Sequence, residues 1–152
     1  MDRCEQVAQE AVRKGWCIGS AHCALGIVAV RREDYSLAYY HWLKAAELNR
    51  ADGYAFLGIL YYYGDGCPAD VGKARQCWQK ALELDSENHY ALYYLGLLYK
   101  EGYGVSQNFG KAYECLYKAA ELGNDDAKKE VADLKTRHTS EELFGSSHHA
   151  VP

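Results

Sequence analysis

Residues 91–120 read ALYYLGLLYKEGYGVSQNFGKAYECLYKAA, and this stretch decides the fold. It opens with an apolar helical pattern, breaks at Gly102-Tyr103-Gly104, and resumes as a second helical pattern from Lys111. Residues 55–82, AFLGILYYYGDGCPADVGKARQCWQKAL, carry the same pattern 38 positions earlier. The matching pairs are Gly58/Gly96, Gly64/Gly102, Gly66/Gly104, Lys73/Lys111, Ala74/Ala112, Cys77/Cys115, Lys80/Lys118 and Ala81/Ala119. Self-similarity at a period of about 20–50 residues indicates a repeat architecture.

Composition limits the classes of function. The chain has 152 residues, 49% hydrophobic and 25% charged, which is typical of one ordinary soluble domain. Its net charge is −4 and its basic residues are scattered, whereas nucleic-acid binding needs clustered Lys and Arg. The charged N-terminus excludes a signal-peptide core, and no stretch approaches the roughly 18 apolar residues of a membrane span. We therefore expect a cytoplasmic protein that binds neither nucleic acid nor membrane.

Cysteines and histidines do not form a recognisable site in the sequence. None of the six cysteines is spaced as CxxC. Cys77 and Cys115 occupy equivalent positions in stacked repeats, about 10 Å apart and beyond the roughly 7 Å limit for a disulfide. We interpret all six as reduced core residues. His41 falls at the position of Cys77 and is interpreted as structural, and His148-His149 offers two ligands without a defined site.

We accordingly expect no metal, no cofactor and no catalytic residue, and hence no enzyme. A Cys–His pair assembled by the fold stays open, because spatial neighbours are invisible in a sequence.

The chain divides into one solenoid over residues 1–137 and a tail over 138–152. We expect a half-repeat (2–15), three helix pairs (20–49, 50–85 and 86–123) and a polar C-terminal capping helix (124–137). The first pair has a shorter turn than the others and lacks the GxG motif. The composition of the tail is typical of disorder, although residues 139–142 predict one helical turn.

On these residues the chain resembles the Sel-one-like repeat family, a branch of the tetratricopeptide superfamily. The family pattern is roughly AxAxxxLGxxYxxGxGVxxDxxKAxxWxxKAAExG. The third repeat matches it at Ala91, Leu95, Gly96, Tyr99, Gly102, Gly104, Val105, Lys111, Ala112, Lys118, Ala119, Ala120, Glu121 and Gly123. The second matches at Leu57, Gly58, Tyr61, Gly64, Gly66, Asp70, Lys73, Ala74, Trp78, Lys80 and Ala81. The resemblance implies an all-α fold: a right-handed α-solenoid of stacked antiparallel helix pairs.

The repeated residues have physical roles in such a fold. Gly58 and Gly96 let the two helices of a pair approach closely, and we expect Trp42 and Trp78 to fill the space between pairs. The GxG motifs end the first helix of a pair with positive φ angles. A phosphate cradle would need a preceding strand, whereas these glycines follow a helix.

The first helix of each pair lines the concave side of a solenoid. At about 100° per residue, an aromatic and aliphatic stripe faces away from the buried arc, and Tyr is a preferred interface residue. We name this stripe the first-helix face and predict that it binds a partner; its residues are Phe56, Tyr63, Tyr90, Tyr94, Ile59 and Leu97, with Arg31, Asp52 and Glu101 as charged edges. The alternative is burial by neighbouring helices, above all for Ile27, Ile59 and Leu97. Leu143-Phe144 of the tail could occupy the same face.

The resemblance implies a non-enzymatic adaptor or scaffold that binds a segment of another protein, and we expect a monomer. Two alternatives stay open: an inhibitor or immunity protein of a toxin or effector, and a cysteine-rich redox or haem-linked assembly factor.

Overall fold

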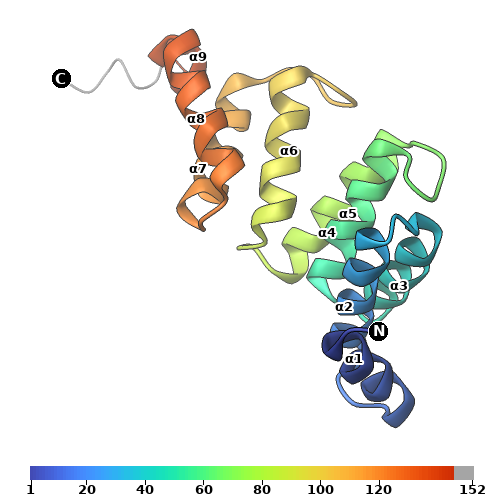
Figure 1. The fold of residues 1–152 in the computed structure, drawn as a ribbon. Helices are drawn as coiled ribbons and strands as arrows, with labels where there is room; N and C mark the ends of the chain where they lie inside the picture. The colour runs from blue at the N-terminus through green and yellow to red at the C-terminus, as the bar shows by residue number, and fades with distance from the viewer. Residues whose placement is uncertain (146–152) are drawn as a thin grey trace. The chain divides into compact units, whose positions relative to one another are not determined.

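The computed structural model describes residues 1–145, and these residues form helices and no strand (Figure 1). The helices are α1 (Arg3–Lys14), α2 (Ile18–Arg31), α3 (Tyr35–Glu47), α4 (Ala51–Tyr63), α5 (Val71–Leu84), α6 (His89–Glu101), α7 (Phe109–Glu121), α8 (Asp125–Arg137) and α9 (Ser140–Phe144). The all-α prediction is therefore confirmed. No described helix is long and apolar enough to cross a membrane.

The chain forms two compact units, Met1–Ser86 and a second that begins at Glu87. In the first unit α2 pairs with α3, α4 pairs with α5, α3 packs against α4, and α1 packs against α2. In the second unit α6 pairs with α7, and both α8 and α9 pack against α7. The first unit thus has two helix pairs with α1 packed on the first of them, and the second unit has one pair with α8 and α9 packed on α7.

Repeated Asp and Asn residues begin the second helices of the pairs, and repeated glycines end two of the first helices. The second helix of each pair begins at an Asx cap, Asp34, Asp70 or Asn108, whose side-chain oxygen accepts a hydrogen bond from the backbone N–H three residues on. Gly64 and Gly66 have φ angles of 73° and 71°, and the glycines of the next GxG have 67° and 71°. The predicted positive-φ turns are confirmed, and they explain why glycine recurs there.

In each pair, a large side chain of the second helix packs against a glycine of the first helix. The Trp78 indole N–H donates to the Ala55 carbonyl at 3.0 Å, and a Cβ at Gly58 would lie 2.5 Å from the same indole nitrogen. Leu116 occupies the equivalent position in the α6/α7 pair, against Gly96. Trp78 therefore packs against the first helix of its own pair, and the expectation that it also fills the space between pairs stays a prediction.

Trp42 of α3 packs in the same way against the first helix of its pair, and it also contacts the next pair. Its ring lies against Gly26 of α2, and its centroid is 5.0 Å from the centroid of Phe56 on α4. Trp42 thus packs within its own pair and against the next one, so the prediction that it fills the space between pairs is confirmed.

The repeated tyrosines and lysines contact each other. The Lys73 ammonium lies 5.5 Å from the centre of the Tyr61 ring, and Lys111 lies 5.4 Å from that of Tyr99. Such cation–π contacts hold the start of the second helix over the first. The hydroxyls of Tyr39 and Tyr61 are 3.1 Å apart, and burial with this hydrogen bond raises the pKa of Tyr61.

The cysteines are free thiols, but they are not all core residues. Cys23, Cys67, Cys77 and Cys115 are half-buried, and burial raises the pKa of Cys23 and of Cys77 to about 11. Cys4 and Cys17 are exposed. The prediction of six core cysteines is therefore wrong for these two, which lie on α1 and at the start of α2.

Candidate protein-binding surfaces

In the first unit, the first-helix face is partly exposed. Tyr63 is 57% exposed, and Arg31 and Asp52 are exposed at its edges. Ile59 and Phe56 are half-buried, since Phe56 packs on Trp42. The exposure expected from sequence is found at Tyr63 and is smaller at Phe56, because a bulky neighbour in the preceding pair covers that ring.

In the second unit, the same face is formed by α6. Tyr90 is 37% exposed, and its ring centroid lies 4.1 Å from that of His89. Tyr94 and Leu97 are half-buried, while Glu101 is exposed. The fold therefore presents aromatic rings with a charged edge on the first helices of both units.

Two histidines that are distant in sequence meet in the first unit. The Nδ1 atoms of His22 and His41 are 2.9 Å apart, and burial lowers the pKa of both side chains. Two neutral rings share one proton in such a contact, so the pair supports the structural role predicted for His41. Over residues 1–145, no three His, Cys, Asp or Glu side chains gather in a way that could hold a metal ion.

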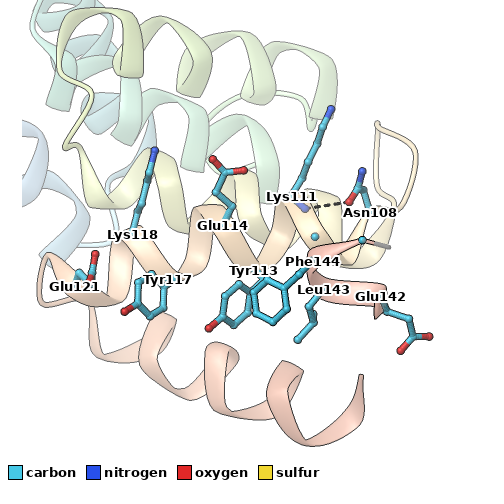
Figure 2. A pocket seen from close by; sticks show the side chains of 12 residues that line it. Asn108, Lys111, Tyr113, Glu114, Tyr117, Lys118, Glu121, Glu142, Leu143 and Phe144 are labelled. Atoms are coloured by element: carbon cyan, nitrogen blue, oxygen red, sulfur yellow. Dashed lines mark hydrogen bonds between the residues drawn. The ribbon is translucent and has the colours of Figure 1, made fainter. Parts of the chain in front are cut away.

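The sequence analysis missed a hollow of about 690 Å³ on the second helix of the third pair. Its lining residues are Asn108, Gly110, Lys111, Tyr113, Glu114, Tyr117, Lys118, Glu121, Glu142, Leu143, Phe144 and Gly145. Figure 2 shows the rings of Tyr113, Tyr117 and Phe144 together on one side of α7. Tyr113 stacks on Tyr117 with centroids 5.7 Å apart, and Phe144 meets Tyr113 edge-on at 5.0 Å.

The tail contributes to this hollow. Thr139 and Glu142 form the capping box of α9, so the predicted helical turn is confirmed. Leu143 is only 5% exposed and packs with its helix on α7. The suggestion that Leu143-Phe144 occupies the first-helix face is therefore wrong, because these residues cover a second helix. His148-His149 lies outside the described residues.

A second, more apolar hollow of about 450 Å³ lies between α1 and α2. Its lining residues are Arg3, Cys4, Val7, Ala8, Ala11, Cys17, Ser20, Ala21 and Ala24. Val7 is 61% exposed at its rim. The sequence signal for this hollow is the helical spacing of Cys4, Val7, Ala8 and Ala11 along α1.

The paired helices and glycine turns define a tetratricopeptide-like α-solenoid fold. The Sel1 repeat model matches residues 20–49, 51–86 and 89–124, and the chain belongs to the Sel1 repeat family. Proteins of this family are generally protein–protein interaction modules and typically non-enzymatic scaffolds.

Solved structures with the same fold support this assignment. A protective antigen of uropathogenic Escherichia coli, c5321, has 25% sequence identity and a TM-score of 0.75 over 90% of this chain and 29% of its own. Helicobacter pylori cysteine-rich protein B has 26% identity and a TM-score of 0.62 over 83% of this chain and 96% of its own. A Sel1 repeat protein from Oxalobacter formigenes, at 23% identity, has a TM-score of 0.70 over 78% of this chain and 49% of its own.

Curated relatives match shorter stretches. Human superkiller complex protein 3 is 35% identical over 86 residues, which are 53% of this chain. The match to the β-lactamase HcpA of Helicobacter pylori is 42% identical over 53 residues, 35% of this chain. The chain spans only 5% of the length of the first protein and 21% of the second.

Proposed function

We propose that this chain is a non-enzymatic adaptor that binds a segment of another protein on its first-helix face. The observation that carries the proposal is the exposure of large aromatic side chains, Tyr63 at 57% and Tyr90 at 37%, on first helices. A face that meets only water has no physical need of tyrosine, whereas an interface gains from its large area and polar tip.

The charged residues at the edges of the first-helix face suit a partner segment that carries both apolar and charged side chains. Arg31 and Asp52 carry opposite charges at the edge of the face in the first unit, and Glu101 adds a negative charge on α6. Rim charges of both signs fix the orientation of a bound segment more than they raise its affinity. We expect a partner segment with aromatic or aliphatic anchors and at least one basic residue.

The test is affinity capture from a lysate of the source organism, followed by mass spectrometry. The native chain is compared with a Tyr63→Glu, Tyr90→Glu double variant, because both side chains are exposed and their replacement leaves the core intact. Phe56 and Tyr94 are less suitable, since both are half-buried and Phe56 packs on Trp42.

A Tyr117→Glu variant is the matched control, because Tyr117 is 41% exposed but lies on α7. Circular dichroism first establishes that all variants keep the native helix content. A partner lost only by the double variant supports the proposal. A partner lost only by Tyr117→Glu assigns binding to the hollow of Figure 2 instead, and capture of no partner by the native chain contradicts the adaptor role.

A further inference from the structure

The hollow between α1 and α2 lies where a complete repeat has its first helix. In the α2/α3 pair, the first helix α2 packs against α3 and also contacts α4. Helix α1 is the second helix of a half-repeat, and no described residue forms a first helix for it. A helix laid against both α1 and α2 would therefore make the contacts that α2 makes with α3 and α4.

Small side chains on α1 and α2 leave room for another helix at this hollow. The left-handed residues Gly15 and Asn49 end α1 and α3 in the same way, so Ala8 of α1 corresponds to Trp42 of α3. Ala24 of α2 corresponds in turn to Phe56 of α4. Trp42 and Phe56 pack together between the pairs, whereas the two alanines line the hollow. The hollow thus accepts side chains that another helix supplies.

The exposed face of α1 at the rim of the hollow is complementary in charge to a second, antiparallel copy of itself. Arg3, Val7 and Glu10 are spaced i, i+4 and i+7, so they form one stripe along the helix. The stripe reads positive, apolar, negative, with Val7 at its centre and 61% exposed. When two such helices lie antiparallel about a two-fold axis near Val7, Arg3 of each faces Glu10 of the other.

We propose that two copies of this chain associate through antiparallel α1 helices, each placing its Val7 at the apolar hollow of the other. The contact is isologous, so each ion pair between Arg3 and Glu10 forms twice. It also repeats the antiparallel arrangement of first and second helices that the fold uses in its complete pairs. The interface is about one helix wide, so the dimer is weak, with a dissociation constant in the micromolar range or above.

The existing partners of Glu10 are compatible with this contact. In the single chain its carboxylate lies 2.6 Å from the Lys14 ammonium and 3.7 Å from an Arg13 nitrogen, and all three side chains are exposed. Exposed pairs within one helix contribute little, and a carboxylate accepts several donors. Arg3 of the second copy can therefore share the Glu10 carboxylate without displacing Lys14.

Sedimentation velocity at low ionic strength tests the proposal. Protein concentrations of roughly 5 to 500 μM span the dissociation constants expected of such a weak interface. The native chain is expected to pass from its monomer mass of 17.1 kDa towards twice that mass. Val7→Glu should weaken the association at least about a hundredfold, because it places a carboxylate in an apolar hollow. Gln6→Glu adds the same charge at an exposed position outside the lining and should change the dissociation constant less than about twofold.

A charge exchange tests the antiparallel geometry itself. Arg3→Glu and Glu10→Arg should each weaken the dimer about tenfold, since each removes two symmetry-related ion pairs and creates repulsion. The double variant restores both pairs with reversed signs and should return to within about threefold of the native constant. A merely structural role of either side chain would give no such rescue.

Two results would overturn the proposal. One is a native chain that stays monomeric over the whole concentration range. The other is a dimer that Val7→Glu leaves intact or that the charge exchange fails to rescue, because the contact then lies elsewhere. Circular dichroism of each variant distinguishes loss of the dimer from loss of α1.

Discussion

Helices flank the three matched repeats on both sides, and the two sides differ. At the N-terminal end, α1 leaves Val7 exposed beside an apolar hollow. At the C-terminal end, α8 presents a polar outer face and α9 places Leu143, only 5% exposed, against α7. A solenoid has to cover or polarise the face that the missing helix leaves. Within residues 1–145, an apolar face is thus covered beside α7 and left exposed beside α1.

The helices at both ends are held by an ion pair and by apolar burial, but the buried side chains differ in size. The Glu5 carboxylate of α1, 7% exposed, accepts hydrogen bonds at 2.9 and 2.6 Å from the Arg32 guanidinium, and Ala8 of α1 packs in an apolar cluster with Ala21 and Leu25. Helix α8 is held by Leu134, which has no exposed area, with the Lys100–Glu130 ion pair beside it.

Thiol labelling at pH 8 should give the largest difference between the ends. Cys4 and Cys17 are exposed beside the N-terminal hollow, whereas Cys115 on α7 is half-buried and burial raises its pKa. Because the thiolate is the reactive form, Cys115 should react at least about tenfold more slowly than the two exposed thiols. Intact-mass spectrometry after timed maleimide pulses measures the rates. Six equally slow thiols would contradict the exposed apolar face beside α1.

Truncation of one apolar side chain at each end should have unequal effects. Leu134→Ala should lower the free energy of unfolding by about 3 kcal/mol, because it leaves a cavity in a fully buried site. Val7→Ala should change it by less than about 0.5 kcal/mol, because Val7 is mostly exposed. Urea unfolding followed by circular dichroism measures both. Equal effects would mean that the two ends are buried alike.

The attachment of α9 depends on Leu143. Leu143→Ala should lower the free energy of unfolding by about 2 kcal/mol and raise hydrogen exchange at residues 140–145. Phe144→Ala is the control, since Phe144 is 40% exposed and meets Tyr113 only edge-on. Its effect should be about half as large. Unchanged exchange in the Leu143 variant would show that α9 is held by its backbone alone.

The cap of α9 should give the smallest effect. The Thr139 side chain accepts from the Glu142 backbone N–H, and the Glu142 carboxylate accepts from the Thr139 backbone N–H. Thr139→Ala should cost about 1 kcal/mol, measured as faster hydrogen exchange within α9. Thr139→Ser is the matched control and should keep the native rate. An identical rate in both variants would contradict the role of the cap.

Local patterns predicted most of the fold. The glycine turns at Gly64 and Gly102, the helix pairs and the capping box at Thr139 all follow from residues close together in sequence. The close approach of helices at Gly58 was predicted as well, because a repeated glycine within an apolar helix has few other physical reasons.

What the sequence did not predict depends on contacts between distant residues. The contact between His22 and His41, 19 positions apart, is one example, because no sequence pattern pairs these two rings. Cys4 is exposed because no helix among residues 1–145 covers it, and its own spacing in the sequence does not reveal this. The docking of Leu143 on α7 was missed for the same reason, since a five-residue helix has almost no periodicity to read.

The positions of the tryptophans, two of them packed within helix pairs and Trp16 exposed, allow two optical signals to follow different parts of the molecule. All three, Trp16, Trp42 and Trp78, lie in the unit that ends at Ser86, whereas tyrosines and helices occur in both units. Indole fluorescence therefore records the melting of the first unit alone, and the far-ultraviolet dichroism records both. Superimposable curves from the two signals would mean that the repeats melt as one cooperative body. Separated midpoints would assign a stability to each half of the chain without any mutation.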